Sequence, residues 1–166
     1  MHLGEPRNHV ATIAGAATAV PPYVLTREDV KTYMRRVFDV GERRLDAMMT
    51  VIDHAQVHTR HSIFPIEYIV QPRPLTQTSR DYQEHALRLR QRAAEACLAN
   101  ARMTPHDIDL IITTSCTGFM IPSLDAHLIN LMGFRSDVRR MPLTELGCAA
   151  GAMALARASE FVRAFP

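Results

Sequence analysis

The stretch "DVRRMPLTELGCAAGAMALARASEF", from Asp137 to Phe161, decides the fold, because an extended segment passes through one glycine directly into an alanine-rich helix. Pattern and propensity predict a strand over "DVRRMPLTEL" and a helix from Gly147 onward. The sequence before it has the same order of elements. A long helix is expected with Ser79 as its cap, followed by a strand from about Ile108 to Ser115.

A further helix is expected between the two strands, opening with Pro122 in its first turn and closing at Gly133. Helices that alternate with strands predict an α/β fold with a mainly parallel sheet flanked by helices. The last helix would normally be followed by another strand of the same sheet, but the chain stops at Pro166. We therefore expect residues 1–166 to form one incomplete domain, the front part of something larger.

The first part of the chain predicts one more strand and two more helices. The apolar segment from His9 to Val20 is typical of a buried strand, which the two prolines after it would end. Thr26 is placed to cap a helix over "REDVKTYMRRVFDV", and a second helix is expected from Glu42 to about His54. The segment "VHTRHSIFPIEYIV" is expected to be extended or irregular.

Composition excludes several classes of protein. The 166 residues are 47% hydrophobic with a formal net charge of +2, and the charges are mixed, so we expect a globular protein without a nucleic-acid partner. No apolar run approaches the ~20 residues that span a bilayer, and the N-terminus lacks a signal pattern, which favours a cytoplasmic protein that does not enter membranes. The odd number of cysteines, without CxxC spacing, indicates reduced thiols.

Cys148 has two interpretations. It follows a strand and a glycine and opens a helix, where backbone N–H groups and the helix dipole favour a thiolate, as a nucleophile requires. Small neighbours, from Gly147 to Gly151, leave room for a substrate to reach the sulfur. Cysteine is also one of the most buried residue types, and small residues often serve helix packing. These properties alone leave both interpretations open.

Cys116 and Thr117 follow the other predicted strand. Parallel strands of an open α/β sheet place their ligands at the carboxyl edge, so the two cysteines are expected to leave the same edge. The alternative is an ordinary strand end with a turn at Gly118. The histidines His54, His58 and His61 lack a suitably spaced carboxylate or thiolate, and we expect no metal site.

Longer motifs carry a family resemblance. The segment "SCTGFMIPSLDAHLINLMGFRSDVRRMPLTELGCAAGAMALARA" strongly resembles the bacterial type III polyketide synthases, the chalcone synthase-like branch of the thiolase superfamily. The similarity extends more weakly through "VHTRHSIFPIE" and "ATIAGAATAVPP", and so covers nearly the whole chain. It implies a thiolase-like fold, with residues 1–166 as its amino-terminal domain, truncated before the last strands.

The resemblance also implies roles for individual residues. Cys148 would be the nucleophile that accepts an acyl group from a coenzyme A thioester. Cys116 and Thr117 would line the substrate pocket, where Cys116 would influence the choice of product. Ile121 would reach across a dimer interface into the partner's pocket, and the Ile121–Pro122 peptide would be cis.

The implied activity is that of an acyltransferase. It would condense a coenzyme A-linked starter with malonyl-CoA in decarboxylative Claisen steps, followed by cyclisation, as a homodimer that needs no cofactor beyond its thioester substrates. The family's oxyanion-stabilising histidine and asparagine lie in the second half of the fold, outside these 166 residues, so we expect the isolated chain to be inactive in condensation. The basic residues with which the family contacts coenzyme A are not matched in this sequence, apart from His54, which is a weak substitute for one of them. The coenzyme-binding residues are therefore left unassigned.

Two other interpretations remain. A ketoacyl synthase of the fatty-acid type shares a nucleophilic cysteine at a helix start, but "SCTGFMIPSL" fits that class less well. The chain could instead be a non-catalytic dimerising fragment.

Overall fold

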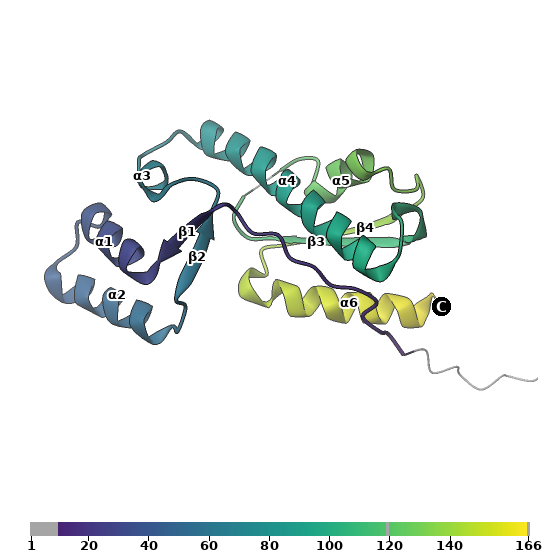
Figure 1. Cartoon of the computed structure of the whole chain (residues 1–166), viewed down its shortest axis with the longest axis horizontal. Helices are drawn as coiled ribbons and strands as arrows, with labels where there is room; N and C mark the ends of the chain where they lie inside the picture. The colour runs from purple at the N-terminus through teal and green to yellow at the C-terminus, as the bar shows by residue number, and fades with distance from the viewer. Residues whose placement is uncertain (1–9, 119, 166) are drawn as a thin grey trace, which may run out of the picture. The chain divides into compact units, whose positions relative to one another are not determined.

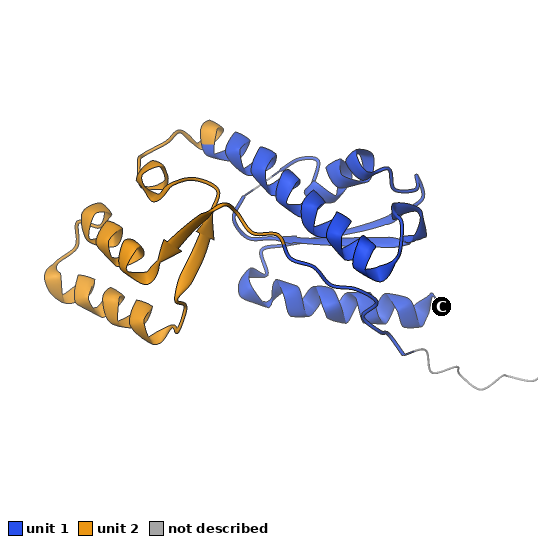
Figure 2. Ribbon diagram, viewed as in Figure 1, with its two compact units in different colours: residues 1–18, 78–166 blue, residues 19–77 orange. Residues whose placement is uncertain are grey.

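The computed structural model describes residues 10–118 and 120–165, and its contacts divide the chain into two compact units. Figure 2 colours them separately: the larger unit joins the beginning of the chain, up to Thr18, to everything from Thr78 onward, and the smaller unit is Ala19–Gln77. That residues 1–166 form a single domain stays a prediction. No helix of the described residues is both long and apolar enough to cross a membrane.

The smaller unit is a helical hairpin beside a two-stranded ribbon. Its elements are β1 (Tyr23–Thr26), α1 (Arg27–Val37), α2 (Glu42–His54), β2 (Thr59–Ser62) and the short helix α3 (Ile66–Ile69). β1 and β2 pair antiparallel, and the buried side chains of Leu45, Met49 and Ile52 on α2 form the core against α1.

The predicted cap of α1 is confirmed. The backbone N–H of Asp29 donates to the hydroxyl of Thr26 at 3.2 Å, and the N–H of Thr26 donates to the Asp29 carboxylate at 2.8 Å. This reciprocal pair satisfies two N–H groups that the helix start would otherwise leave without partners.

The larger unit contains the predicted parallel pair of strands (Figure 1). Its elements are α4 (Leu75–Ala101, of which the first three residues belong to the smaller unit), η1 (Pro105–Asp107), β3 (Leu110–Ser115), α5 (Leu124–Met132), β4 (Arg139–Thr144), η2 (Gly147–Ala149) and α6 (Ala150–Ala164). β3 and β4 are parallel, with Leu110 opposite Arg139 and Ser115 opposite Thr144. In Figure 1, α5 and α6 lie on opposite sides of the two strands, so the expected sheet flanked by helices is confirmed.

The strand predicted from His9 to Val20 is wrong for the described residues, 10–20. This segment is irregular, and Val10 and Ile13 are each 78% exposed. A strand requires a hydrogen-bonded partner, and no described strand pairs with these residues. The segment lies instead against the end of α4, where the amide of Asn100 donates to the carbonyl of Ala16 at 2.9 Å.

Three predicted helix starts also differ from the structure. α4 begins at Leu75, so Ser79 lies inside the helix and does not cap it; Pro74, which precedes the first turn, loses no helical hydrogen bond there. Pro122 precedes Ser123, the N-cap of α5, and does not lie within the first turn. The chain from Gly147 first makes the 3₁₀ turn η2, and the α-helix begins at Ala150.

Candidate active site

The carboxyl edge of the parallel sheet carries both predicted cysteines. β3 ends at Ser115, directly before Cys116, and β4 ends at Thr144, its partner in the register, a short turn before Cys148. Both thiols are free and exposed. The structure therefore confirms that the two cysteine loops leave neighbouring strands at one edge.

Cys148 lies in η2, after a sharply bent turn. Glu145 (φ 64°) and Gly147 (φ 53°) both adopt the left-handed backbone conformation. Glycine does so freely, whereas for Glu145 this conformation costs about 1 kcal/mol, the kind of local strain that clusters at functional sites. The bend takes the chain from β4 into α6 and leaves the thiol on the surface.

The space around the thiol is open. A methyl group built on Gly147 or on Gly151 would meet no other heavy atom within 4 Å, when chain neighbours are left aside. The thiol of Cys148 is thus exposed and flanked by two glycines with open space beside them, a setting compatible with nucleophilic attack on a thioester.

The three residues expected in a substrate pocket lie on the surface. Cys116 and Thr117 form the exposed bend after β3, and Ile121 is 98% exposed. The Ile121–Pro122 peptide is cis, as expected. A small cavity of about 70 Å³ does lie at this edge of the sheet, but those three residues do not line it; its walls include Tyr82, Ser115, Gly118, Met120 and Thr144.

A buried carboxylate behind this edge was missed by the sequence analysis. Asp125, at the start of α5, is 0% exposed; its carboxylate accepts a hydrogen bond from Thr113 Oγ1 on β3 at 3.1 Å and from Arg140 Nε on β4 at 2.5 Å. Arg140 also donates to Ser123 Oγ at 2.9 Å. Burial would raise the pKa of Asp125, but hydrogen bonds from Ser123 and Arg140 offset this and hold the pKa below its usual range.

The sequence offered only part of that signal. An acidic residue in the first turn of a helix interacts favourably with the positive end of the helix dipole, and Asp125 has that position. Its partner Arg140 lies on a different strand, and no spacing rule connects the two residues. The network fixes the start of α5 against both strands, behind the loop that carries Cys116.

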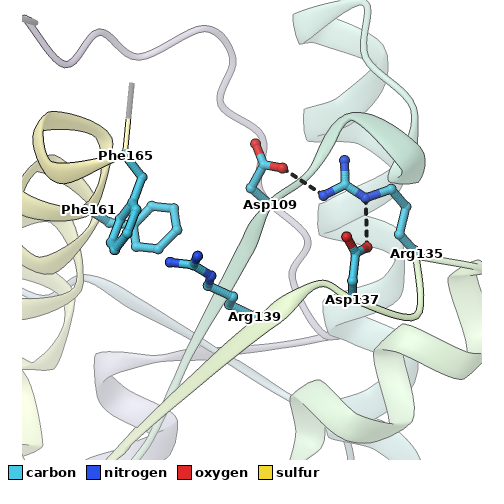
Figure 3. A pocket seen from close by; sticks show the side chains of 6 residues that line it. All are labelled: Asp109, Arg135, Asp137, Arg139, Phe161 and Phe165. Carbon is cyan, nitrogen blue, oxygen red and sulfur yellow. Dashed lines mark hydrogen bonds and ion pairs between the residues drawn. The ribbon is translucent and has the colours of Figure 1, made fainter.

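The opposite edge of the sheet holds a different side-chain cluster, which lines a cavity of about 490 Å³ (Figure 3). Arg135 donates to Asp109 at 2.7 Å and to Asp137 at 3.0 Å, and these carboxylates raise its pKa. The Arg139 guanidinium carbon lies 5.2 Å from the ring centre of Phe161 and 4.2 Å from that of Phe165. The cavity lining contains no nucleophilic thiol or hydroxyl, and the cluster ties the strand starts to the end of α6.

The histidines do not gather into a metal site. His58 Nδ1 lies 2.7 Å from an Arg27 guanidinium nitrogen, and His61 Nδ1 lies 3.1 Å from the carbonyl oxygen of Pro21. Within residues 10–118 and 120–165, no three side chains of the metal-binding types come together.

Proteins from several bacteria are similar to this chain in sequence. The chain is 38% identical over 157 residues to 1,3,6,8-tetrahydroxynaphthalene synthase of Streptomyces griseus, a match that covers 95% of this chain and 42% of the relative. It is 33% identical over 143 residues to phloroglucinol synthase of Pseudomonas fluorescens, covering 86% of this chain and 41% of the relative. The chain thus spans less than half the length of these relatives.

A solved structure shows the same fold. The crystal structure of 1,3,6,8-tetrahydroxynaphthalene synthase from Streptomyces coelicolor A3(2), a bacterial type III polyketide synthase, superposes with a TM-score of 0.87 at 37% identity, covering 94% of this chain and 44% of that one. The fold is therefore thiolase-like. The family model described as FAE1/type III polyketide synthase-like protein matches residues 19–166. The chain belongs to this family of type III polyketide synthase-like proteins.

Proposed function

We propose that this chain supplies the nucleophile of a type III polyketide synthase, with Cys148 as the residue that carries the acyl group. The observation that supports this most is the exposed thiol on a bent strand-to-helix turn, at the carboxyl edge of a parallel sheet. The second cysteine loop, with Cys116 and Thr117, leaves the same edge and would form part of the substrate pocket.

The first chemical step is a transfer between two thioesters. The Cys148 thiolate attacks the carbonyl carbon of a starter acyl-CoA, the carbon–sulfur bond to coenzyme A breaks, and the coenzyme leaves as a thiolate that takes up a proton. Small residues around Cys148 would let the thioester approach.

Chain extension forms a carbon–carbon bond. Malonyl-CoA would lose CO₂, and the carbanion so formed would attack the acyl-cysteine carbonyl, which releases the Cys148 thiolate and leaves a longer acyl-CoA. Repeated extension and cyclisation would complete a polyketide. Because the charge that develops on oxygen needs aligned donors, and the family's histidine and asparagine lie outside residues 1–166, we propose that this chain alone does not extend the acyl group.

The proposed assembly is a homodimer in the cytoplasm, where thiols stay reduced. Its support is Ile121, whose apolar side chain is 98% exposed and which lies between β3 and α5, as Cys116 and Thr117 do. Covering such a side chain would stabilise a dimer, because apolar surface is removed from water. Its position near the pocket loop would let it reach the partner's pocket.

Acylation of the intact chain tests the proposal. Incubation with acetyl-CoA or malonyl-CoA should add one acyl group to the wild type, seen by intact-mass spectrometry, and peptide mapping should place it on Cys148. Cys148→Ala should abolish the adduct. Cys97→Ala, which removes the half-buried thiol of α4, should keep it.

Alkylation gives a second readout that needs no coenzyme A. Under native conditions iodoacetamide should modify Cys148 faster than Cys97. Equal labelling of both thiols, or an acyl adduct that survives in Cys148→Ala, would contradict the assignment of the nucleophile. A polyketide formed by the wild-type chain from malonyl-CoA would contradict the proposed need for residues outside it.

A further inference from the structure

Tyr82 on α4 contacts the loop after β3 on both sides of Cys116 and Thr117. Its hydroxyl lies 2.5 Å from Ser115 Oγ, so the two hydroxyls share a hydrogen bond at the last residue of the strand. Its ring packs against Gly118: a methyl group built on Gly118 would lie 2.5 Å from the ring Cγ and 2.7 Å from Cδ1. One side chain thus holds the residue before the bend and the residue after it.

We infer that Tyr82 is a positioning residue for the Cys116 bend, defined here as residues 116 and 117. The inference rests on the proposed function in one respect, because the bend matters for substrate only if Cys116 and Thr117 line the pocket. No sequence pattern connects this tyrosine with the bend, since it lies on a different element, well before β3 in the chain.

The helix that carries Tyr82 is also attached to β3 at a second point. Further along α4, the Arg90 guanidinium donates to the carbonyl oxygen of Thr114 at 2.9 Å, one residue before Ser115. α4 is therefore attached to the end of β3 at two consecutive residues, by a charged donor to the backbone and by a phenol to a side chain. We expect this attachment to hold Tyr82 and Ser115 together.

The same contact reaches the other cysteine loop through the sheet. Ser115 is opposite Thr144, the last residue of β4, and both line the small cavity beside Tyr82. If the end of β3 loosened, the last rung of the ladder would loosen with it, and so would the start of the turn to Cys148. Tyr82 should therefore influence Cys116 directly and Cys148 through the strand pair.

Two substitutions separate the two halves of the contact. Tyr82→Phe removes the hydroxyl and keeps the ring against Gly118. Gly118→Ala keeps the hydroxyl but places a methyl group inside the van der Waals radius of the ring, so ring or bend must shift. Matched controls exist for both: Tyr33→Phe removes another 2.5 Å phenol hydrogen bond, to Glu67, and Gly151→Ala adds a methyl group that meets nothing within 4 Å.

The test is a fluorine label on Cys116. In the full chain with Cys97→Ala and Cys148→Ala, a trifluoroacetonyl group on Cys116 should give one narrow ¹⁹F resonance. Tyr82→Phe and Gly118→Ala should each split, broaden or shift that resonance, while Tyr33→Phe and Gly151→Ala should leave it unchanged, with native circular dichroism throughout. An unchanged resonance in Tyr82→Phe, or an equal change in Tyr33→Phe, would overturn the inference.

Acylation separates this inference from the proposed function. In chains with all three cysteines, Tyr82→Phe should slow acylation of Cys148 by acetyl-CoA several-fold at saturating thioester, whereas Tyr33→Phe should not. A changed ¹⁹F resonance in a chain whose wild type is never acylated would support the positioning role and contradict the proposed function. Normal acylation with an unchanged resonance in Tyr82→Phe would do the reverse.

Discussion

Asp125 is the residue at which three elements of the larger unit meet, because α5 supplies the carboxylate and β3 and β4 supply its donors. A fully buried carboxylate is tolerated only when hydrogen bonds and an opposite charge replace water. Thr113 and Arg140 do so here. The loop that carries Cys116 and Ile121 runs between β3 and the N-cap of α5, so this network anchors the far end of that loop.

Substitution of Asp125 should reveal that role through stability and its pH dependence. Asp125→Asn should lower the free energy of unfolding by about 2 kcal/mol at neutral pH, because hydrogen bonds to a charged group are lost or weakened. The folded pKa lies below the ordinary 3.8, so the carboxylate's contribution is complete above that value and is lost as the pH falls through the folded pKa.

Urea unfolding of the wild type and of Asp125→Asn between pH 7 and pH 2 checks this prediction. The stability difference between them should be constant down to about pH 4 and then shrink. Asp39→Asn, at an exposed position between α1 and α2, is the control and should show no such difference. A difference that grows toward acid pH would mean that the carboxyl is protonated in the folded state.

Single residues differ in how far the sequence predicts them. Cys148 could be selected because strand, glycine and helix start are adjacent in sequence, so local rules apply. Asp125 with Arg140, and Tyr82 with Ser115, are pairs whose members lie on different elements. Only the packing of α4, α5 and the strands brings them together, and no local pattern encodes that packing.

Helix ends were predicted well where the backbone conformation or its unpaired N–H groups require a particular type of residue. Gly133 closes α5 with φ 68°, the left-handed conformation that the predicted C-terminal glycine requires, and Thr26 caps α1 through its side chain. The strand expected over residues 9–20 is absent from the described part, residues 10–20, because a strand depends on a partner, which composition does not reveal. The predicted start of α4 was too late in the chain, because Ser79, a polar residue inside the helix, resembles a cap.

The C-terminal glycine of α5 gives a test at this scale. Gly133→Ala should lower the free energy of unfolding by about 1 kcal/mol, since a Cβ is unfavourable in the left-handed conformation even though the space around it is open. Gly151→Ala lies within α6 in equally open space and should be neutral or stabilising. Thermal unfolding of both variants measures the contrast; equal loss in the two would show that added volume, and not backbone conformation, is responsible.

Across the whole chain, α6 presents an apolar surface that the described residues do not cover. Leu155 and Val162, seven residues apart on one face of the helix, are 64% and 43% exposed. The relatives have more than half of their length outside the region matched by this chain. We expect this surface to be covered in a complete synthase, and in the isolated chain to promote association.

Sedimentation velocity over a range of concentrations measures that association. The wild-type chain should self-associate as concentration rises, and Leu155→Glu should shift the distribution toward monomer because it places a charge on the apolar surface. Val51→Glu changes an exposed residue of α2, 69% exposed, and is the control. A wild type that stays monomeric throughout, or an equal effect of the two glutamates, would contradict the role given to α6.

The parallel register described above also bears on how such a protein can change. Ser115 and Thr144 are paired opposite each other at the ends of β3 and β4. A substitution in one cysteine loop should therefore change that loop while the paired strands keep the start of the other loop in place. Loops held by a rigid frame tolerate variation better than the frame itself. The strand pair is thus a frame on which we expect substitutions in the two cysteine loops to be tolerated better than substitutions in the strands themselves.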